Sequence, residues 1–190
     1  FYKEIIILFQ NLWKIYWRLC TFQVGPEVVP SHLIWIFFLM LCNLLASAWI
    51  VSAFSEQVDF FSHFFTRAIL LVFYVLQTWI IFYFKRYRDR LSVVFSALMG
   101  KEMIFMFLIF IVLMVQEVFG ANSVSDGAQM SGSSALMGFV LLLLYAWNLS
   151  VEGFIFSKAL SVGFFLGLSL ALALFMVNEQ LESSFAKLFM

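Results

Sequence analysis

The stretch from Leu33 to Phe54 contains no Asp, Glu, Lys or Arg and consists almost entirely of apolar side chains. A helix of about 20 apolar residues is long enough to cross the hydrocarbon core of a bilayer. Inside lipid, every backbone amide and carbonyl must find a partner within the protein, and a helix meets this requirement by itself. The stretch therefore predicts an integral membrane protein built from helices.

Apolar runs of similar length recur along the rest of the chain, and the composition agrees with them. Hydrophobic residues make up 64% of the 190 residues and charged residues 12%, compared with about 45–50% and about 25% in soluble domains. A soluble core of this size could not cover so much apolar surface. We predict an all-α, polytopic transmembrane helix bundle that forms a single membrane domain over 1–190, with about five spans at 31–54, 64–84, 103–119, 134–151 and 159–177.

The first 24 residues follow a different pattern, in which polar and apolar side chains occupy separate faces of a helix. Lys3, Lys14 and Arg18 fall within one narrow arc, and most of the remaining surface is Ile, Leu and aromatic side chains. Such a helix suits the membrane interface, where aromatic rings reach the headgroups. We predict an interfacial amphipathic helix over 1–24; the alternative is a spanning helix whose polar stripe faces the bundle. The rings expected at headgroup level are those of Trp13, Tyr16 and Trp17.

The cluster Lys85–Arg90 directly follows the second apolar run and holds four of the eleven Lys and Arg residues. Short loops next to membrane spans carry an excess of Lys and Arg on the cytoplasmic side. Placing this cluster in the cytoplasm puts nine of the eleven basic residues on that side. The pattern predicts a cytoplasmic N-terminus and an external C-terminus, and we expect the membrane to be a bacterial inner membrane.

The same residues predict a cationic cytoplasmic surface. Each well-placed basic side chain contributes about 1 kcal/mol of attraction to anionic headgroups. We expect this surface to contact membrane lipids and hypothesise that it also docks a cytoplasmic partner. Its members are Lys85, Arg86, Arg88, Arg90, Lys14 and Arg18.

Two glycines are expected to mark helix ends near the cytoplasmic face. Residues 91–98 carry apolar side chains at helical spacing, which predicts a short amphipathic helix that ends at Gly100. Gly153 follows the fourth apolar run and predicts the start of a short turn towards Lys158.

Charged residues lie at the ends of the predicted spans. Lys101 is expected on the cytoplasmic side, Glu117 at the outer end of the third span and Glu152 at the inner end of the fourth. Carboxylates within a membrane are typical of pumps and exchangers. Because water reaches span ends, the sequence favours solvated boundary residues over a transport role.

Asn43 and Gln77 are uncharged polar residues at membrane depth. Such residues either line a path for a solute or hold helices together by hydrogen bonds of about 0.6 kcal/mol or somewhat more. The sequence favours helix–helix hydrogen bonding and leaves the solute path open.

Gly163, Gly167 and Ala171 repeat every four residues. Small residues at this spacing let two membrane helices approach closely. The stripe predicts a tight helix contact, either within this chain or with another copy.

The sequence lacks the short motifs that mark hydrolases, phosphate-binding loops and zinc sites. Cys20 and Cys42 stand alone in apolar runs, which indicates buried or lipid-facing thiols rather than a disulfide framework. Glu56, Asp59 and His63 have helical spacing, but a metal site usually needs more ligands, so a solvated loop is favoured. We predict no catalytic residues, no metal site and no cofactor.

The pattern of a cytoplasmic N-terminal segment, five spans and an external C-terminus resembles the Yip family of membrane proteins, which are named for interaction with Rab-type GTPases. Members of that family commonly carry Asp-Leu-Tyr-Gly-Pro ahead of the first span, and Phe22–Pro26 here retains the Gly-Pro. The small-residue-rich segment from Tyr145 to Val177 is similar to the closing hairpin of bacterial relatives. The resemblance implies a role in membrane organisation, trafficking or assembly without catalysis.

These observations favour a non-enzymatic membrane scaffold or assembly accessory protein that acts through helix–helix contacts with other membrane proteins or with itself. The alternative is a small transporter or channel subunit for a solute or lipid, resting on Asn43, Gln77 and Glu117. An intramembrane lipid-modifying enzyme is the least supported. The formal net charge is zero, so no nucleic-acid partner is expected.

Overall fold

A computed structural model describes residues 2–54, 60–120 and 132–189, with side chains described for 10–54, 60–117 and 136–185. Within these residues the chain is helical, with six α-helices, two short 3-10 helices and no strand. The prediction of an all-α bundle is therefore confirmed. In chain order the elements are α1 (Tyr2–Cys20), η1 (Pro26–Val28), α2 (Leu33–Phe54), α3 (Phe60–Phe84), η2 (Arg88–Arg90), α4 (Leu91–Gly120), α5 (Gly132–Leu160) and α6 (Phe164–Phe189).

Five of the described helices are long and apolar enough to cross a membrane. Large apolar side chains cover much of their outer surface; Ile34, for example, is 86% exposed and Phe165 80% exposed. Exposing so much apolar surface to water is unfavourable, whereas contact with lipid avoids this free-energy penalty. The chain is thus a helical integral membrane protein, as the sequence predicted. The candidate spans are Leu33–Phe54, Phe60–Phe84, Arg88–Glu117, Leu136–Leu160 and Phe164–Phe185.

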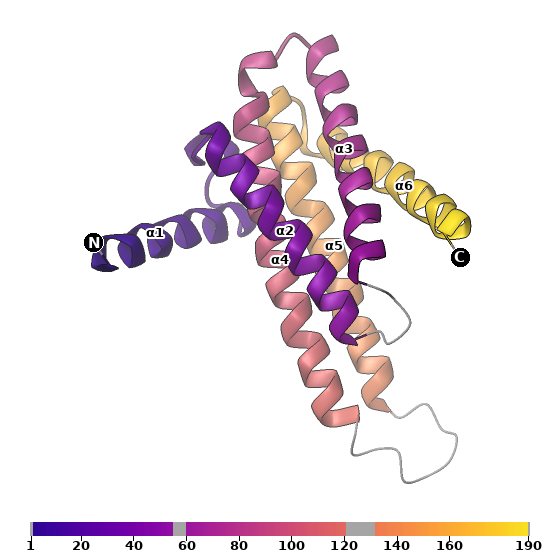
Figure 1. Cartoon of the computed structure of the whole chain (residues 1–190). Coiled ribbons are helices and arrows are strands. Elements are labelled where there is room, and N and C mark those ends of the chain that lie inside the picture. Colours follow the sequence, from indigo (N-terminus) through magenta and orange to yellow (C-terminus); the bar gives the residue numbers. More distant parts are fainter. Residues whose placement is uncertain (1, 55–59, 121–131, 190) are drawn as a thin grey trace.

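The long helices α4 and α5 run side by side through the centre of the bundle (Figure 1). Helix α2 packs on α4, helix α3 packs on α2 and α6, and the contact between α5 and α6 is the most extensive of all. Helices α1 and α6 leave the bundle at wide angles on opposite sides (Figure 1). We call the end of the bundle that carries Lys85–Arg90 the basic end.

Helix α1 is anchored to the bundle by a chain of hydrogen bonds through Tyr16. The indole Nε1 of Trp35 donates to the Tyr16 hydroxyl at 2.8 Å, and this hydroxyl lies 3.0 Å from Oγ of Ser96. The Ser96 hydroxyl in turn donates to the carbonyl of Pro30. Burial raises the pKa of the Tyr16 phenol, so the hydroxyl keeps its proton at neutral pH. Trp13 is 37% exposed and Trp17 43% exposed, whereas Tyr16, which we expected at headgroup level, turns into the protein.

Gly100 does not end a helix, contrary to the sequence prediction, because α4 continues through it from Leu91 to Gly120. A Cβ atom at this position would overlap the ring of Tyr16. The glycine therefore provides space for α1 to dock on α4. The predicted short amphipathic helix over 91–98 is the first part of the third span.

Gly153 does not start a turn either, because α5 continues to Leu160. A Cβ atom here would lie 2.7 Å from Cα of Leu168 in α6, which is closer than real Cβ contacts come. The glycine permits close packing of two helices, and the fifth span begins at Phe164 rather than at residue 159.

Three helices end at residues in the left-handed backbone region that are not glycine. These residues are Phe22, Arg86 and Ser161, with φ of 61°, 59° and 53°. After each helix the chain closes with the paired backbone hydrogen bonds of a Schellman motif; Val162 N, for instance, bonds to Ser157 O at 3.0 Å. Because glycine usually occupies this position, no local sequence signal marked these ends.

The small-residue stripe is used within the chain. A Cβ atom at Gly167 would overlap the carbonyl oxygen of Gly153 and would lie 2.7 Å from N of Ser157. Ala171, one turn further along, is fully buried. Gly163 plays no such part, since a Cβ atom there would meet nothing within 4 Å. The tight contact is thus between α5 and α6 and involves two of the three predicted residues.

The two cysteines are both free. Cys20 is 1% exposed, and burial raises the pKa of its thiol to about 12. The thiol therefore stays protonated at neutral pH and is a poor nucleophile.

We predict that Gly167→Ser lowers the free energy of unfolding by about 1–3 kcal/mol, because the new side chain must separate α5 from α6. Gly138→Ser is the matched control, since it makes the same change in open space within the partner helix α5. Denaturation of both variants in mixed micelles measures the difference. Equal stability of the two variants would contradict the close contact.

Candidate functional site

Lys101 lies in the interior of the bundle, where its side chain is only 1% exposed. Its ammonium donates to Oε1 of Glu102 at 2.7 Å and to Oε2 of Glu152 at 2.9 Å. The third donor contact is with Oδ1 of Asn148 at 2.9 Å. An ammonium has three protons to donate, and each of them has an acceptor here.

Two further hydrogen bonds complete this group of side chains. The Tyr74 hydroxyl of α3 donates to Oε1 of Glu152 at 2.7 Å, so both oxygens of this carboxylate have partners. The amide Nδ2 of Asn148 lies 3.4 Å from Oε1 of Glu102. We call Tyr74, Lys101, Glu102, Asn148 and Glu152 the charged cluster; it joins α3, α4 and α5.

The helices bring the cluster to one depth. Asn148 and Glu152 are four residues apart on α5 and therefore lie on one face. With a rise of about 1.5 Å per residue, Tyr74 and Lys101 lie about 15 Å along their helices from the basic end, and Glu152 lies about 12 Å from it. Helix α4 has 30 residues and is therefore about 45 Å long, so the cluster lies about a third of the way along it from the basic end.

A cavity of about 260 Å³ lies beside the cluster. It is bounded by side chains of α2, α3, α4, α5 and α6, and Glu102, Asn148, Glu152 and Tyr74 form part of its wall. Apolar and aromatic groups complete the wall, including Leu70, Met106, Phe105, Tyr145 and Phe175.

An ion pair borders the cavity at some distance from the cluster. Nη2 of Arg67 lies 3.1 Å from Oε1 of Glu182, and the two side chains are 38% and 33% exposed. Arg67 is seven residues from Tyr74 on α3, a separation of about 10 Å along the helix axis. The cavity therefore extends from an exposed ion pair, away from the basic end, to the buried cluster.

Several polar atoms next to the cavity have no hydrogen-bond partner among the described residues. They are Oδ1 of Asn43, Oδ1 of Asn178 and Nε of Arg67. A buried polar atom without a partner costs about 1–3 kcal/mol. The wall of the cavity therefore offers hydrogen-bonding groups that the described residues leave unused.

The structure places the two predicted intramembrane polar residues at helix contacts. Nδ2 of Asn43 donates to the carbonyl of Met99 at 2.9 Å and so ties α2 to α4. Oε1 of Gln77 lies 3.4 Å from Nδ2 of Asn178 and so ties α3 to α6. Asn43 also borders the cavity, whereas Gln77 does not.

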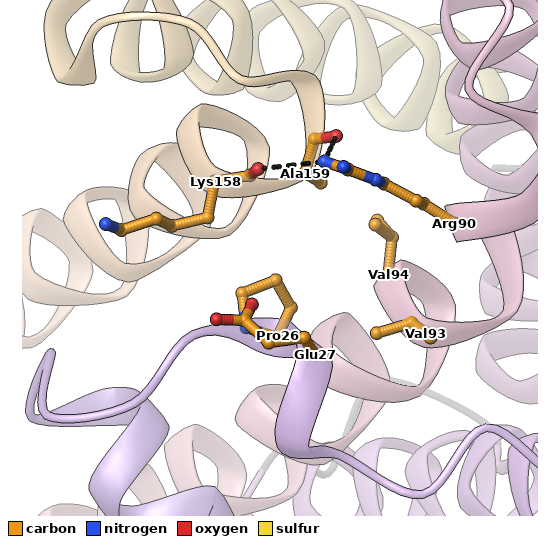
Figure 2. A pocket seen from close by; sticks show the side chains of 7 residues that line it. All are labelled: Pro26, Glu27, Arg90, Val93, Val94, Lys158 and Ala159. Carbon is orange, nitrogen blue, oxygen red and sulfur yellow. Dashed lines mark hydrogen bonds between the residues drawn. The ribbon is translucent and has the colours of Figure 1, made fainter.

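A second cavity, of about 370 Å³, lies at the basic end between η1, α4 and α5 (Figure 2). The Arg90 guanidinium is already used there, since Nη1 donates to the Ala159 carbonyl at 3.0 Å and to Oγ of Ser161 at 3.2 Å. The Lys158 ammonium points away from the cavity (Figure 2) and lies 5.7 Å from the Phe154 ring centre. Arg90 thus caps the end of α5, and this cavity offers no free cation.

The other predicted basic residues are exposed. Lys85, Arg86 and Arg88 surround the turn after α3, and the Arg88 guanidinium lies 4.0 Å from the Tyr83 ring centre. Lys14 and Arg18 border a separate hollow on α1 together with Trp13 and Trp17. The structure thus describes two groups of exposed cations on separate elements.

Lys101 and Glu152 are not solvated, contrary to the interpretation of the sequence. Both side chains are buried, since α4 and α5 continue past Gly100 and Gly153 and carry the charges into the bundle. The four-residue spacing of Asn148 and Glu152 was a usable signal, whereas nothing marked Tyr74.

The remaining candidates stay outside this site. Glu117 is exposed near the other end of α4. Glu56 and Asp59 lie outside the described residues, and within the described ranges no three His, Cys, Asp or Glu side chains gather as a metal site.

Fold and site together define an all-α integral membrane protein with a charged cluster and a polar cavity inside its bundle. No protein-family model, no curated protein and no solved structure matches the chain.

We predict that Lys101→Met lowers the free energy of unfolding by about 3–5 kcal/mol, because it leaves buried carboxylates without a counter-charge. Adding Glu152→Gln should recover at least half of the loss. A double-mutant cycle measured by denaturation in mixed micelles gives the coupling between the two residues.

The matched control is the exposed pair Arg67→Gln and Glu182→Gln, for which we expect a coupling of about 1 kcal/mol or less. Coupling energies of equal size in the two cycles would contradict the claim that the buried Lys101–Glu152 pair stabilises the fold more than the exposed pair does.

Proposed function

We propose that this protein is a small transporter or channel subunit that binds a polar solute in the cavity beside the charged cluster. The observation that supports this most is the cavity itself, which joins an exposed ion pair to charges buried inside the helix bundle. Ionisable groups inside spans are costly, and they commonly mark ion and substrate pathways.

The structure offers less support for the alternative that the protein is a membrane scaffold. Gly167 and Ala171, which could have served a partner protein, pack within the chain. A scaffold would be served by a dry, apolar interior, whereas unpaired polar atoms border the cavity of this one. The resemblance to the Yip family, with its role in trafficking, stays a prediction.

The proposal assigns binding and passage to the cavity rather than covalent chemistry. None of the two histidines and two cysteines lines it, and the Lys101 ammonium is occupied by three acceptors. These groups suit the recognition of charge more than nucleophilic attack.

We further propose the orientation with the basic end in the cytoplasm of a bacterial inner membrane. The exposed residues Lys85, Arg86, Arg88 and Lys158 support it through the positive-inside rule. The Arg67–Glu182 pair would then lie towards the outer side and would be the entrance for a solute from outside.

Cysteine accessibility tests the proposal. Leu44 lines the cavity, whereas its neighbour Leu45 is 46% exposed on the outer surface of the same helix. In a background carrying Cys20→Ala and Cys42→Ala, we expect a membrane-impermeant methanethiosulfonate to label Leu44→Cys at least tenfold faster than Leu45→Cys. The thiolate attacks the sulfur of the reagent and displaces sulfinate, and the thiolate forms in water and not in lipid.

Applying the reagent to one face of oriented vesicles at a time identifies the entrance. Labelling of Leu44→Cys from the outer face is the expected result. Equal, slow labelling of both variants from either face would mean a dry interior and would leave the scaffold as the better account.

A further inference from the structure

More acidic than basic side chains surround the cavity. Four carboxylates line it, those of Glu102, Glu152, Glu179 and Glu182. Arg67 pairs with Glu182, and Lys101 alone serves both Glu102 and Glu152. Glu179, which is exposed at the edge of the cavity, has no hydrogen-bond or ion-pair partner among the described residues. With all groups ionised, the site carries an excess of two negative charges.

The unpaired amide oxygens point to the same kind of ligand. Asn43 is only 9% exposed, and its Oδ1 borders the cavity without a donor. Oδ1 of Asn178 is in the same situation. Both atoms accept hydrogen bonds and cannot donate them, so a ligand that satisfies them must bring donors or positive charge.

Aromatic rings form a third part of the wall. Phe105 and Tyr145 pack edge to face with ring centres 5.2 Å apart, and Tyr74 and Phe175 also line the cavity. The face of an aromatic ring attracts a cation, and sites for organic ammonium groups combine such rings with acidic side chains. Tyr145, Glu102 and Glu179 line the same cavity, so one ligand there meets both a ring and carboxylates.

We propose that the cavity binds a small organic ammonium cation. This inference rests on the proposed function and names the chemical class of its solute. An anion would meet the excess of carboxylates. A bare inorganic cation needs several oxygen ligands close together, whereas much of this wall is apolar or aromatic.

Thermal unfolding of the full chain in detergent tests the inference, with choline chloride as the probe. Because a ligand that binds only the folded state stabilises it by mass action, choline should raise the melting temperature along a saturating curve. Equal concentrations of sodium chloride control for ionic strength. The uncharged isostere 3,3-dimethyl-1-butanol controls for shape, and neither control should reproduce the shift.

Two matched substitutions locate the effect. Glu179→Gln removes a carboxylate that has no partner among the described residues, so the protein should fold normally and need about two- to fivefold more choline for half of the shift. Glu117→Gln makes the same change at an exposed position outside the cavity and should leave the curve unchanged.

A choline shift that equals the shift with sodium chloride or with the neutral isostere would overturn the inference. So would an unchanged curve in Glu179→Gln. If Leu44→Cys is accessible to water and choline gives no specific shift, only the ammonium inference fails. If Leu44→Cys is inaccessible, the cavity assignment fails as well.

Discussion

The buried ammonium of Lys101 is the constraint on which the centre of this bundle depends. Moving such a charge out of water costs several kcal/mol after relaxation, and the Lys101 side chain is 1% exposed inside the bundle. Its three acceptors come from α4 and α5, and Tyr74 of α3 completes the coordination of Glu152. Helices α3, α4 and α5 must therefore keep a fixed register relative to one another.

Two kinds of contact determine how the helices of this bundle pack. Small residues set the distance between helices, as at Gly100 under the Tyr16 ring and at Gly167 against α5. Polar side chains set the register, as in the charged cluster and in the bond from Asn43 to Met99. These contacts leave a cavity between α2, α3, α4, α5 and α6. Polar atoms without a hydrogen-bond partner border this cavity, and helix packing alone does not explain why they are there.

The sequence predicted the class of fold because a protein solvated by lipid needs an apolar composition and apolar stretches long enough to cross the membrane. It did not predict the third to fifth spans at their observed ends. Gly100 and Gly153 were interpreted as helix ends, yet each is required by a neighbour distant in the chain, while real ends fall at Arg86 and Ser161 with no glycine. The site was missed for the same reason. In the sequence, Lys101 and Glu152 lie next to the ends of apolar stretches and look like boundary residues. Only the packing of α4 on α5 shows that they form an ion pair.

The ionisation state of Glu152 tests this account most directly, because an ammonium can be buried at this depth only if its partners carry negative charge. Difference infrared spectroscopy of the wild-type protein against Glu152→Gln reports which band disappears. The account predicts the loss of an ionised carboxylate band at neutral pH. Loss of a protonated carboxyl band instead would mean that Lys101 and Glu152 do not form an ion pair, and it would contradict the role given to the charged cluster.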